Sequence, residues 1–198
     1  MPGGLKSNQI EDGEVKTPDI ASGAVTEVKI TYADKTKALF VPWWAFSPIT
    51  STFTKPDRVS WNTNLWAYGF EAADDEYIAG AFMVPEDAKA ASSILIDAIW
   101  SPSTTPSSED VVWRIVHSYG AEGEAFSGWS TSGAVVAGAG TTQYKQIATL
   151  LATITGRSAR DVVNVRIDRV GVSGSDTYPA DALFHGLRVR YTSDRRGS

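Results

Sequence analysis

Apolar and polar residues alternate with a period of two in several segments of the chain. Such alternation is typical of strands in sheets with one face in solvent. The pattern predicts strands over residues 93–100, 110–119, 161–170 and 183–191. Strands are also predicted over residues 59–70, which are rich in aromatic side chains, and over the short segment 77–84 that ends at Pro85. Residues 144–155 fit either a helix or a strand, and their Thr content and flanking strands favour a strand. Helix signals are otherwise weak, and one short helical turn is expected over residues 86–92.

Six or more strands with no βαβ rhythm predict an all-β fold. The loops between them are rich in Pro, Ser, Thr and Gly, as in residues 101–108. We therefore expect an antiparallel β-sandwich of the jelly-roll type.

The first 36 residues follow a different rule. Apolar side chains recur there at a strict spacing of five: Leu5, Ile10, Val15, Ile20, Val25 and Ile30. A period of five fits neither a helix nor a strand, so these side chains have no local partner to bury them. Sister copies around a symmetry axis or the surface of another protein would bury them, whereas a flexible tail with chance spacing would leave them exposed.

The aromatic residues place the boundary between the two regions. Of 21 aromatic residues, only Tyr32 precedes Phe40. Because large aromatic side chains dominate core burial, the globular core is expected to begin near residue 40. We expect an extended anchoring or collar arm over residues 1–38 and a β-sandwich head over residues 39–198.

The arm resembles a known family. Residues 10–30 read Ile-Glu-Asp-Gly-Glu-Val-Lys-Thr-Pro-Asp-Ile-Ala-Ser-Gly-Ala-Val-Thr-Glu-Val-Lys-Ile. They resemble the decad repeats of tailed-bacteriophage virion appendage proteins, in which such repeats precede a head-decoration, head-fibre or tail-fibre domain. Residues 156–169, 176–181 and 183–191 are similar to the closing strands of phage virion β-sandwich domains. The resemblance implies a virion location, a homotrimer, and attachment through the arm to the capsid or another virion protein.

The composition of the chain argues against several other classes of protein. The chain has 198 residues and no Cys, so it has neither a disulfide framework nor a thiolate metal site. Its net charge of −5 does not fit nucleic-acid binding. No apolar run is long enough to span a membrane, and no secretory signal peptide is expected.

Charge is distributed unevenly along the chain. Residues 157–198 hold eight Arg and five Asp, a local net charge of +3. Two interpretations remain open: solvated charges on the outer faces of strands, or a basic face that meets an acidic partner or a second copy.

Catalytic candidates are few. His117 and His185 lie on predicted strands beside apolar residues, which favours half-buried structural roles over a metal site or a serine triad. The acidic run Asp74-Asp75-Glu76 is the only candidate for glycoside hydrolysis or calcium binding, and a solvated turn is the favoured interpretation. We expect no enzyme activity and no cofactor or metal.

Two further features of the sequence are a pair of adjacent tryptophans and a structural ion pair. Trp43 and Trp44 point to opposite sides of an extended chain, so that one fills the sandwich while the other contacts a partner protein or a sugar, or together they join the arm to the head. Arg169 is placed to pair with Asp176 or Asp181 across a loop. The expected function is a non-enzymatic capsid-decoration or head-fibre protein, and the alternative is a tail-fibre head that recognises a host-surface glycan.

Overall fold

The alternating segments form strands in the structure, a computed structural model that describes residues 34–48, 54–61 and 65–193. One group of strands comprises β1 (Lys35–Pro42), β3 (Asp57–Trp61), β4 (Leu65–Phe70), β6 (Ile94–Pro102), β10 (Ile147–Ile154) and β12 (Ala182–Ser193). The other comprises β2 (Phe46–Pro48), β5 (Asp75–Met83), β7 (Asp110–Gly120), β8 (Ser130–Thr131), β9 (Val135–Gly138) and β11 (Val162–Val170). Within the described ranges the only helical element is a single 3-10 turn, η4 (Trp43–Ala45).

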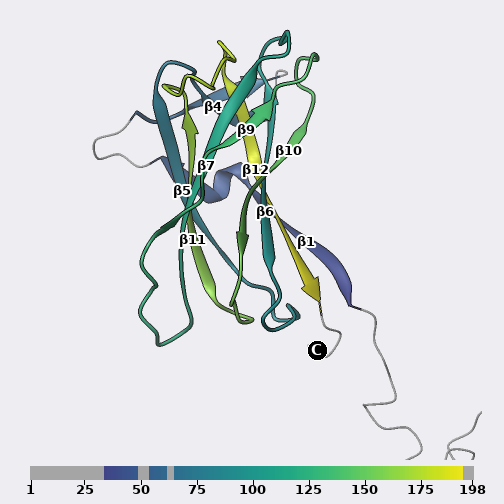
Figure 1. Cartoon of the computed structure of the whole chain (residues 1–198), viewed down its shortest axis with the longest axis vertical. Coiled ribbons are helices and arrows are strands. Elements are labelled where there is room, and N and C mark those ends of the chain that lie inside the picture. The colour runs from purple at the N-terminus through teal and green to yellow at the C-terminus, as the bar shows by residue number, and fades with distance from the viewer. Residues whose placement is uncertain (1–33, 49–53, 62–64, 194–198) are drawn as a thin grey trace, which may run out of the picture. The chain divides into compact units, whose positions relative to one another are not determined.

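Each group forms a six-stranded antiparallel sheet. Sheet A has the order β10-β6-β12-β4-β3, and β1 pairs with β12 beyond the end of β4. Sheet B has the order β2-β5-β11-β7-β8, and β9 also pairs with β7. The chain passes from sheet A to sheet B between β1 and β2 through η4 (Figure 1). The fold is therefore all-β, with two antiparallel sheets arranged as a β-sandwich, as the sequence predicted.

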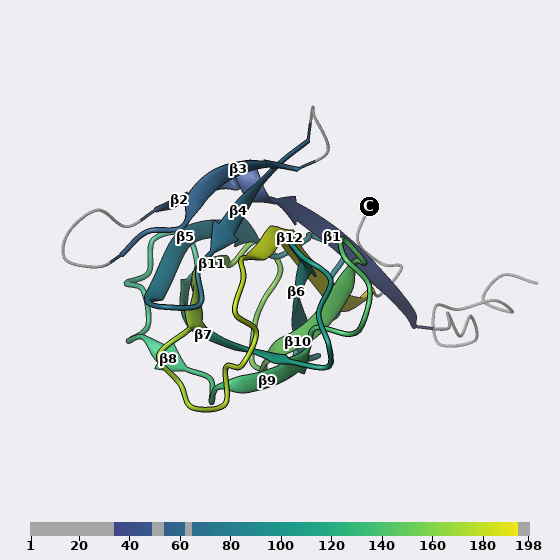
Figure 2. The ribbon, with the colours of Figure 1, turned by 90° about the horizontal axis from the view of Figure 1, so that it is seen from above.

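The core lies between the two sheets, where the period-two pattern directs alternate side chains inward. On β6 the inward set is Ile94, Ile96, Ala98 and Trp100, and all four are buried. On β11 the inward set is Val163, Val165 and Ile167. Trp100 and Trp113 meet at the centre, each with 0% of its surface exposed and with their ring centroids 5.8 Å apart. Viewed from above, the strands of both sheets surround this core (Figure 2).

The structure confirms one local prediction and corrects two. The strand interpretation of residues 144–155 is confirmed by β10. The single strand predicted over residues 59–70 is wrong, because two antiparallel strands, β3 and β4, occupy that segment with Val59 opposite Ala67. The helical turn predicted over residues 86–92 is also wrong, since these residues form hydrogen-bonded turns in which Ala88 bridges to Ser193.

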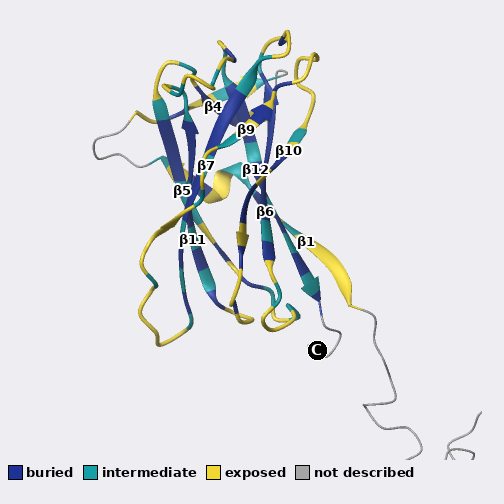
Figure 3. Ribbon diagram, in the orientation of Figure 1, coloured by how far each residue is buried: buried dark blue, intermediate teal, exposed yellow. Residues whose placement is uncertain are grey.

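The first strand runs along the last one. Pairing is continuous from Lys35 opposite Ser193 to Pro42 opposite Gly186, so residues 35–38 of the segment assigned to the arm are paired strand residues. Most of β1 is exposed on its surface (Figure 3). The six period-five residues Leu5, Ile10, Val15, Ile20, Val25 and Ile30 lie outside the described residues. Among the residues that are described, no helix has the length and apolar character needed to cross a membrane.

Candidate functional site

The outer face of sheet A carries a groove lined mainly by aromatic side chains. Its volume is about 270 Å³, and its lining residues are Phe40, Trp61, Leu65, Trp66, Tyr144, Gln146 and His185. They come from β1, β3, β4, β12 and the segment before β10. Phe40, Leu65, Trp66 and Tyr144 are exposed although they are large and apolar. Exposed apolar side chains gathered in one place are typical of a binding surface.

A bulge in β12 shapes one wall of the groove. The register of β12 against β6 shifts between Phe184 and Gly186, and Gly186 has a φ of +150°. A Cβ atom at Gly186 would lie 2.4 Å from the carbonyl oxygen of Val41 and 2.8 Å from the ring of Phe40. Glycine is required here because the backbone of β1 and the Phe40 ring lie directly over the bulge.

His185 forms the polar base of the groove. Its ring lies 5.0 Å from the ring of Trp61, and its Nε2 is 2.8 Å from the hydroxyl of Ser101. Burial lowers the pKa of His185 to about 4, so the imidazole is neutral at neutral pH. This agrees with the half-buried structural role expected from the sequence.

Each sheet carries one cluster of two arginines around a buried aspartate on its outer face. In the sheet A cluster, both carboxylate oxygens of Asp97 accept from Arg190, and Oδ2 also accepts from Nε of Arg188 at 2.8 Å. In the sheet B cluster, Asp168 is held in the same way by Arg166 and by Nε of Arg114 at 2.8 Å. Burial works to raise the pKa of Asp97, but the hydrogen bonds from Arg190 and Arg188 outweigh it and hold the pKa below its usual value. These pairs favour the first interpretation of the Arg-rich C-terminal region, in which outer-face charges are satisfied within the chain.

The adjacent tryptophans differ in exposure. They lie in η4 rather than on an extended chain, which corrects the predicted conformation. Trp43 packs on Tyr68 with ring centroids 5.5 Å apart and has Arg58 over its ring, whereas Trp44 is 69% exposed. The structure does not bring these two residues into the lining of the aromatic groove.

Arg169 and Asp176 form a fully buried ion pair. The guanidinium donates to both carboxylate oxygens at 3.0 and 2.7 Å, and it also donates to the carbonyls of Phe70, Tyr178 and Ala180. Asp176 in turn accepts from the amide of Val112. The pairing predicted with Asp176 is confirmed, and its role is to tie the loop after β11 to both sheets.

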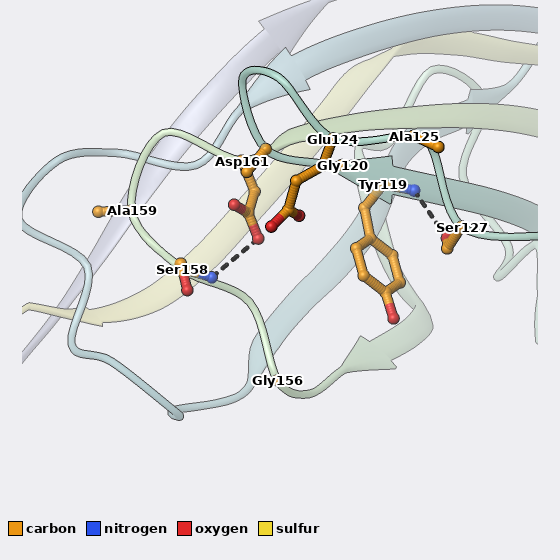
Figure 4. A pocket seen from close by; sticks show the side chains of 10 residues that line it. Tyr119, Gly120, Glu124, Ala125, Ser127, Gly156, Ser158, Ala159 and Asp161 are labelled. Atoms are coloured by element: carbon orange, nitrogen blue, oxygen red, sulfur yellow. Dashed lines mark hydrogen bonds between the residues drawn. The ribbon is translucent and has the colours of Figure 1, made fainter.

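A second pocket, of about 330 Å³, lies at the ends of β7 and β10. Glu124 and Asp161 are directed into it, and Tyr119 forms one side (Figure 4). Asp161 is already engaged, since it accepts from the amide of Ser158 at 2.9 Å. Among the described residues, no three His, Asp or Glu side chains are grouped so that they could hold a metal ion. The described residues that line this pocket are therefore partly polar but include no such metal-binding group.

The acidic run 74–76 does not converge on a common site. Asp74 is exposed directly before β5, and Asp75, the first residue of β5, accepts from the amide of Val172. Glu76 is buried and accepts from the amide of Glu71 at 2.6 Å. Asp75 and Glu76 are successive residues of β5, so their side chains point to opposite faces of the sheet and do not flank a common site as the paired carboxylates of a glycoside hydrolase do.

Glu76 makes stability depend on pH. Burial raises its pKa from 4.5 to about 7, against the hydrogen bond from Glu71 and with help from the negative charges of Glu71, Asp181 and Asp57. Between these two values the folded state keeps a proton that the unfolded state has lost. The stabilisation is therefore complete below about pH 4.5 and is lost as the pH rises through 7.

We expect Glu76→Gln to remove this pH dependence. The amide oxygen still accepts from Glu71, and no charge forms at high pH. Urea unfolding at pH 8 is expected to give a variant up to roughly 3 kcal/mol more stable than the parent chain, and at pH 5 a much smaller difference. Glu86→Gln, at an exposed carboxylate, is the control, and a parallel pH profile for all three proteins would contradict the prediction.

Sequence reasoning missed the aromatic groove as a unit. The sequence predicted one strand over residues 59–70, which contains Trp61, Leu65 and Trp66, and His185 was expected only to have a structural role. The polar triplet at positions 62–64 is a turn signal that separates β3 from β4 and would have placed Trp61 opposite Leu65.

Comparison with known proteins identifies similarity to a solved structure but no matching family. No family model matches the chain, and no curated protein matches it. Among solved structures, it is similar to the CBM36-1 domain of a multidomain xylanase from the hindgut metagenome of Trinervitermes trinervoides, with 8% identity over 77% of this chain and 96% of that chain and a TM-score of 0.41.

Proposed function

We propose that the chain is a non-enzymatic structural protein of a tailed-phage virion. Residues 1–38 anchor it to the capsid or to another virion protein, and the β-sandwich is displayed as a homotrimeric decoration or head-fibre domain. The observation that carries this proposal is the strict five-residue apolar period of the arm. Support comes from the described part of the sandwich, where buried side chains of both sheets pack into one core, as expected of a separate head domain.

We further infer that the sandwich is a jelly roll. Strands β4, β12, β6 and β10 are neighbours in sheet A, and β5, β11, β7 and β9 are neighbours in sheet B. From β4 to β7 each successive strand changes sheet, and from β9 to β12 this alternation repeats. Such a strand order supports two Greek keys folded over one core.

The anchoring role is tested by changing the arm alone. Replacing Ile10, Ile20 and Ile30 with Asp is expected to abolish the trimer in light scattering and co-sedimentation with capsids that lack the protein. The thermal transition of the sandwich is expected to remain. A control that replaces Glu14, Thr17 and Glu27 with Ser keeps the apolar period and should keep both properties. A parent chain that is monomeric and does not sediment with capsids would refute the proposal.

A second function is favoured by the aromatic groove. In this alternative the sandwich is the head of a tail fibre and recognises a host-surface glycan, because aromatic rings stack on the apolar faces of sugars. Purified protein is then expected to bind glycans on an array and to block adsorption of the phage to its host. An array without binding, together with unimpaired adsorption, would leave only the anchoring role.

A further inference from the structure

The aromatic groove lies beside a cationic group on the same face of sheet A. Phe40 is directly opposite Arg188 in the pairing of β1 with β12, and Arg188 is directly opposite Asp97 in the pairing of β12 with β6. Paired residues of adjacent strands share a face, so the Phe40 ring and the Arg188 side chain are neighbours on the outer surface. Adjacent strands are about 4.8 Å apart, close to the width of one sugar ring.

The hydrogen bonds of the sheet A cluster leave Arg188 able to bind a further group. Arg190 uses Nε and Nη2 on the two oxygens of Asp97, whereas Arg188 donates to Asp97 through Nε alone. A guanidinium presents five N–H donors in a fixed fork. The terminal nitrogens of Arg188 therefore retain donors in the geometry that suits a carboxylate.

Charge around the groove favours an anion. Two arginines surround one aspartate in the sheet A cluster, which gives a local net charge of +1. Lys145 is exposed between the lining residues Tyr144 and Gln146, and His185 adds no negative charge. Asp57 is on the same face but four residues along β3 from Trp61, about 13 Å away.

We propose that this groove binds an oligosaccharide that contains hexuronate residues. The Phe40 and Trp61 rings contact the C–H face of a sugar, the amide of Gln146 contacts a hydroxyl, and Arg188 binds the carboxylate. Apolar walls with a few placed polar groups are typical of small-ligand sites, and the negative faces of aromatic rings attract polarised C–H groups. This inference rests on the glycan-recognition function and is independent of how the arm is anchored.

The test uses the full chain and two pairs of matched sugars. The acidic probes are β-1,4-linked tetramers of glucuronate and of mannuronate, and the neutral probes are cellotetraose and mannotetraose. Affinities are measured by NMR titration. We expect both acidic tetramers to bind at least tenfold more tightly than the neutral tetramer of the same linkage, and we expect this advantage to shrink between low and high salt.

Two variants distinguish the contribution of the Arg188 charge to sugar binding from that of the aromatic rings. Arg188→Gln is expected to lower the affinity for the acidic tetramers roughly 10- to 100-fold and to leave the neutral ones unchanged. Arg114→Gln is the matched control, because Arg114 holds Asp168 on sheet B as Arg188 holds Asp97 on sheet A. Phe40→Ala is expected to weaken every probe that binds. Phe126→Ala, at a ring of similar exposure (56% against 52%), is its control.

Each result decides the proposal. No binding of either acidic tetramer would overturn it, and so would equal binding of acidic and neutral sugars. An equal effect of Arg188→Gln and Arg114→Gln would also overturn it. Thermal unfolding of each variant shows whether it is folded, and if Arg188→Gln does not fold, the salt dependence of the parent chain decides. Failure here with normal capsid attachment would leave the anchoring function intact.

Discussion

Replacing Arg169 with Met is expected to lower the free energy of unfolding by about 3–5 kcal/mol. Arg169 has 0% of its surface exposed, so water cannot replace the bonds that it makes. The variant would leave the carboxylate of Asp176 buried without its counter-ion, and it would leave three backbone carbonyls without a donor. A buried charge that loses its partner costs far more than an exposed one.

Urea unfolding of the full chain measures this effect. Arg160→Met is the matched control, because Arg160 pairs with Glu86 while both side chains are exposed. Arg160→Met is expected to lower the free energy of unfolding by less than ~1 kcal/mol. Arg169→Lys keeps the charge but cannot donate to both oxygens of Asp176 in the planar geometry, so it should recover only part of the loss. Similar stabilities for Arg169→Met and Arg160→Met would show that the buried pair does not hold the loop.

The second large effect is expected at the centre of the core. Trp113→Ala is expected to lower the free energy of unfolding by about 3–5 kcal/mol, because it leaves a cavity between the sheets. The ring of Trp113 contacts the rings of Phe70, Trp100 and Phe184. Its Nε1 makes no hydrogen bond within the described residues, so the loss reports packing alone. By contrast, Nε1 of Trp100 donates to Thr149.

Trp44→Ala removes the same side chain from a position that is 69% exposed. We expect it to change the free energy of unfolding by less than ~1 kcal/mol. Denaturant unfolding followed by far-UV circular dichroism compares the two variants without relying on Trp fluorescence. Equal losses would mean that Trp113 is not the centre of the core.

Period-two alternation predicted the long strands because each has one face in the core. β11 illustrates this, with Val163, Val165 and Ile167 all buried. The strands that were missed are β1, β2, β8 and β9. Three of these have only two to four residues, too few to show a period. In β1 the first four residues are exposed on both faces, so no alternation is present to detect.

Burial of charge was harder to predict than burial of apolar residues. The pairing of Arg169 with Asp176 followed from their positions around a loop, but their depth did not. Depth depends on how the segment after β11 folds across the ends of β4 and β7, which is a tertiary contact. Asp168 is likewise buried through contacts between strands, since Arg114 and Arg166 bind its carboxylate and Tyr77 lies opposite it on β5.

The aromatic groove could not be predicted from local patterns. Its residues are spread from Phe40 to His185, and they meet through the pairing of β1, β12, β4 and β3 and through the segment before β10. The two adjacent tryptophans were conspicuous in the sequence for the opposite reason, since they are neighbours along the chain. Trp43 and Trp44 are adjacent in the sequence and lie in η4. The groove is instead formed by residues from distant segments of the chain, which come together in the folded structure.

The pairing of β1 with β12 also determines how the sandwich would bear mechanical load. Tension that is applied at Lys35 along the axis of β1, and opposed elsewhere in sheet A, would act parallel to the pairing of β1 with β12. Eight consecutive register pairs, from Lys35 opposite Ser193 to Pro42 opposite Gly186, would then share the force in shear. Peeling would instead break the pairs one at a time. A strand loaded in shear resists detachment until many hydrogen bonds yield together, so the pairing of β1 with β12 is expected to be strong against tension in this direction.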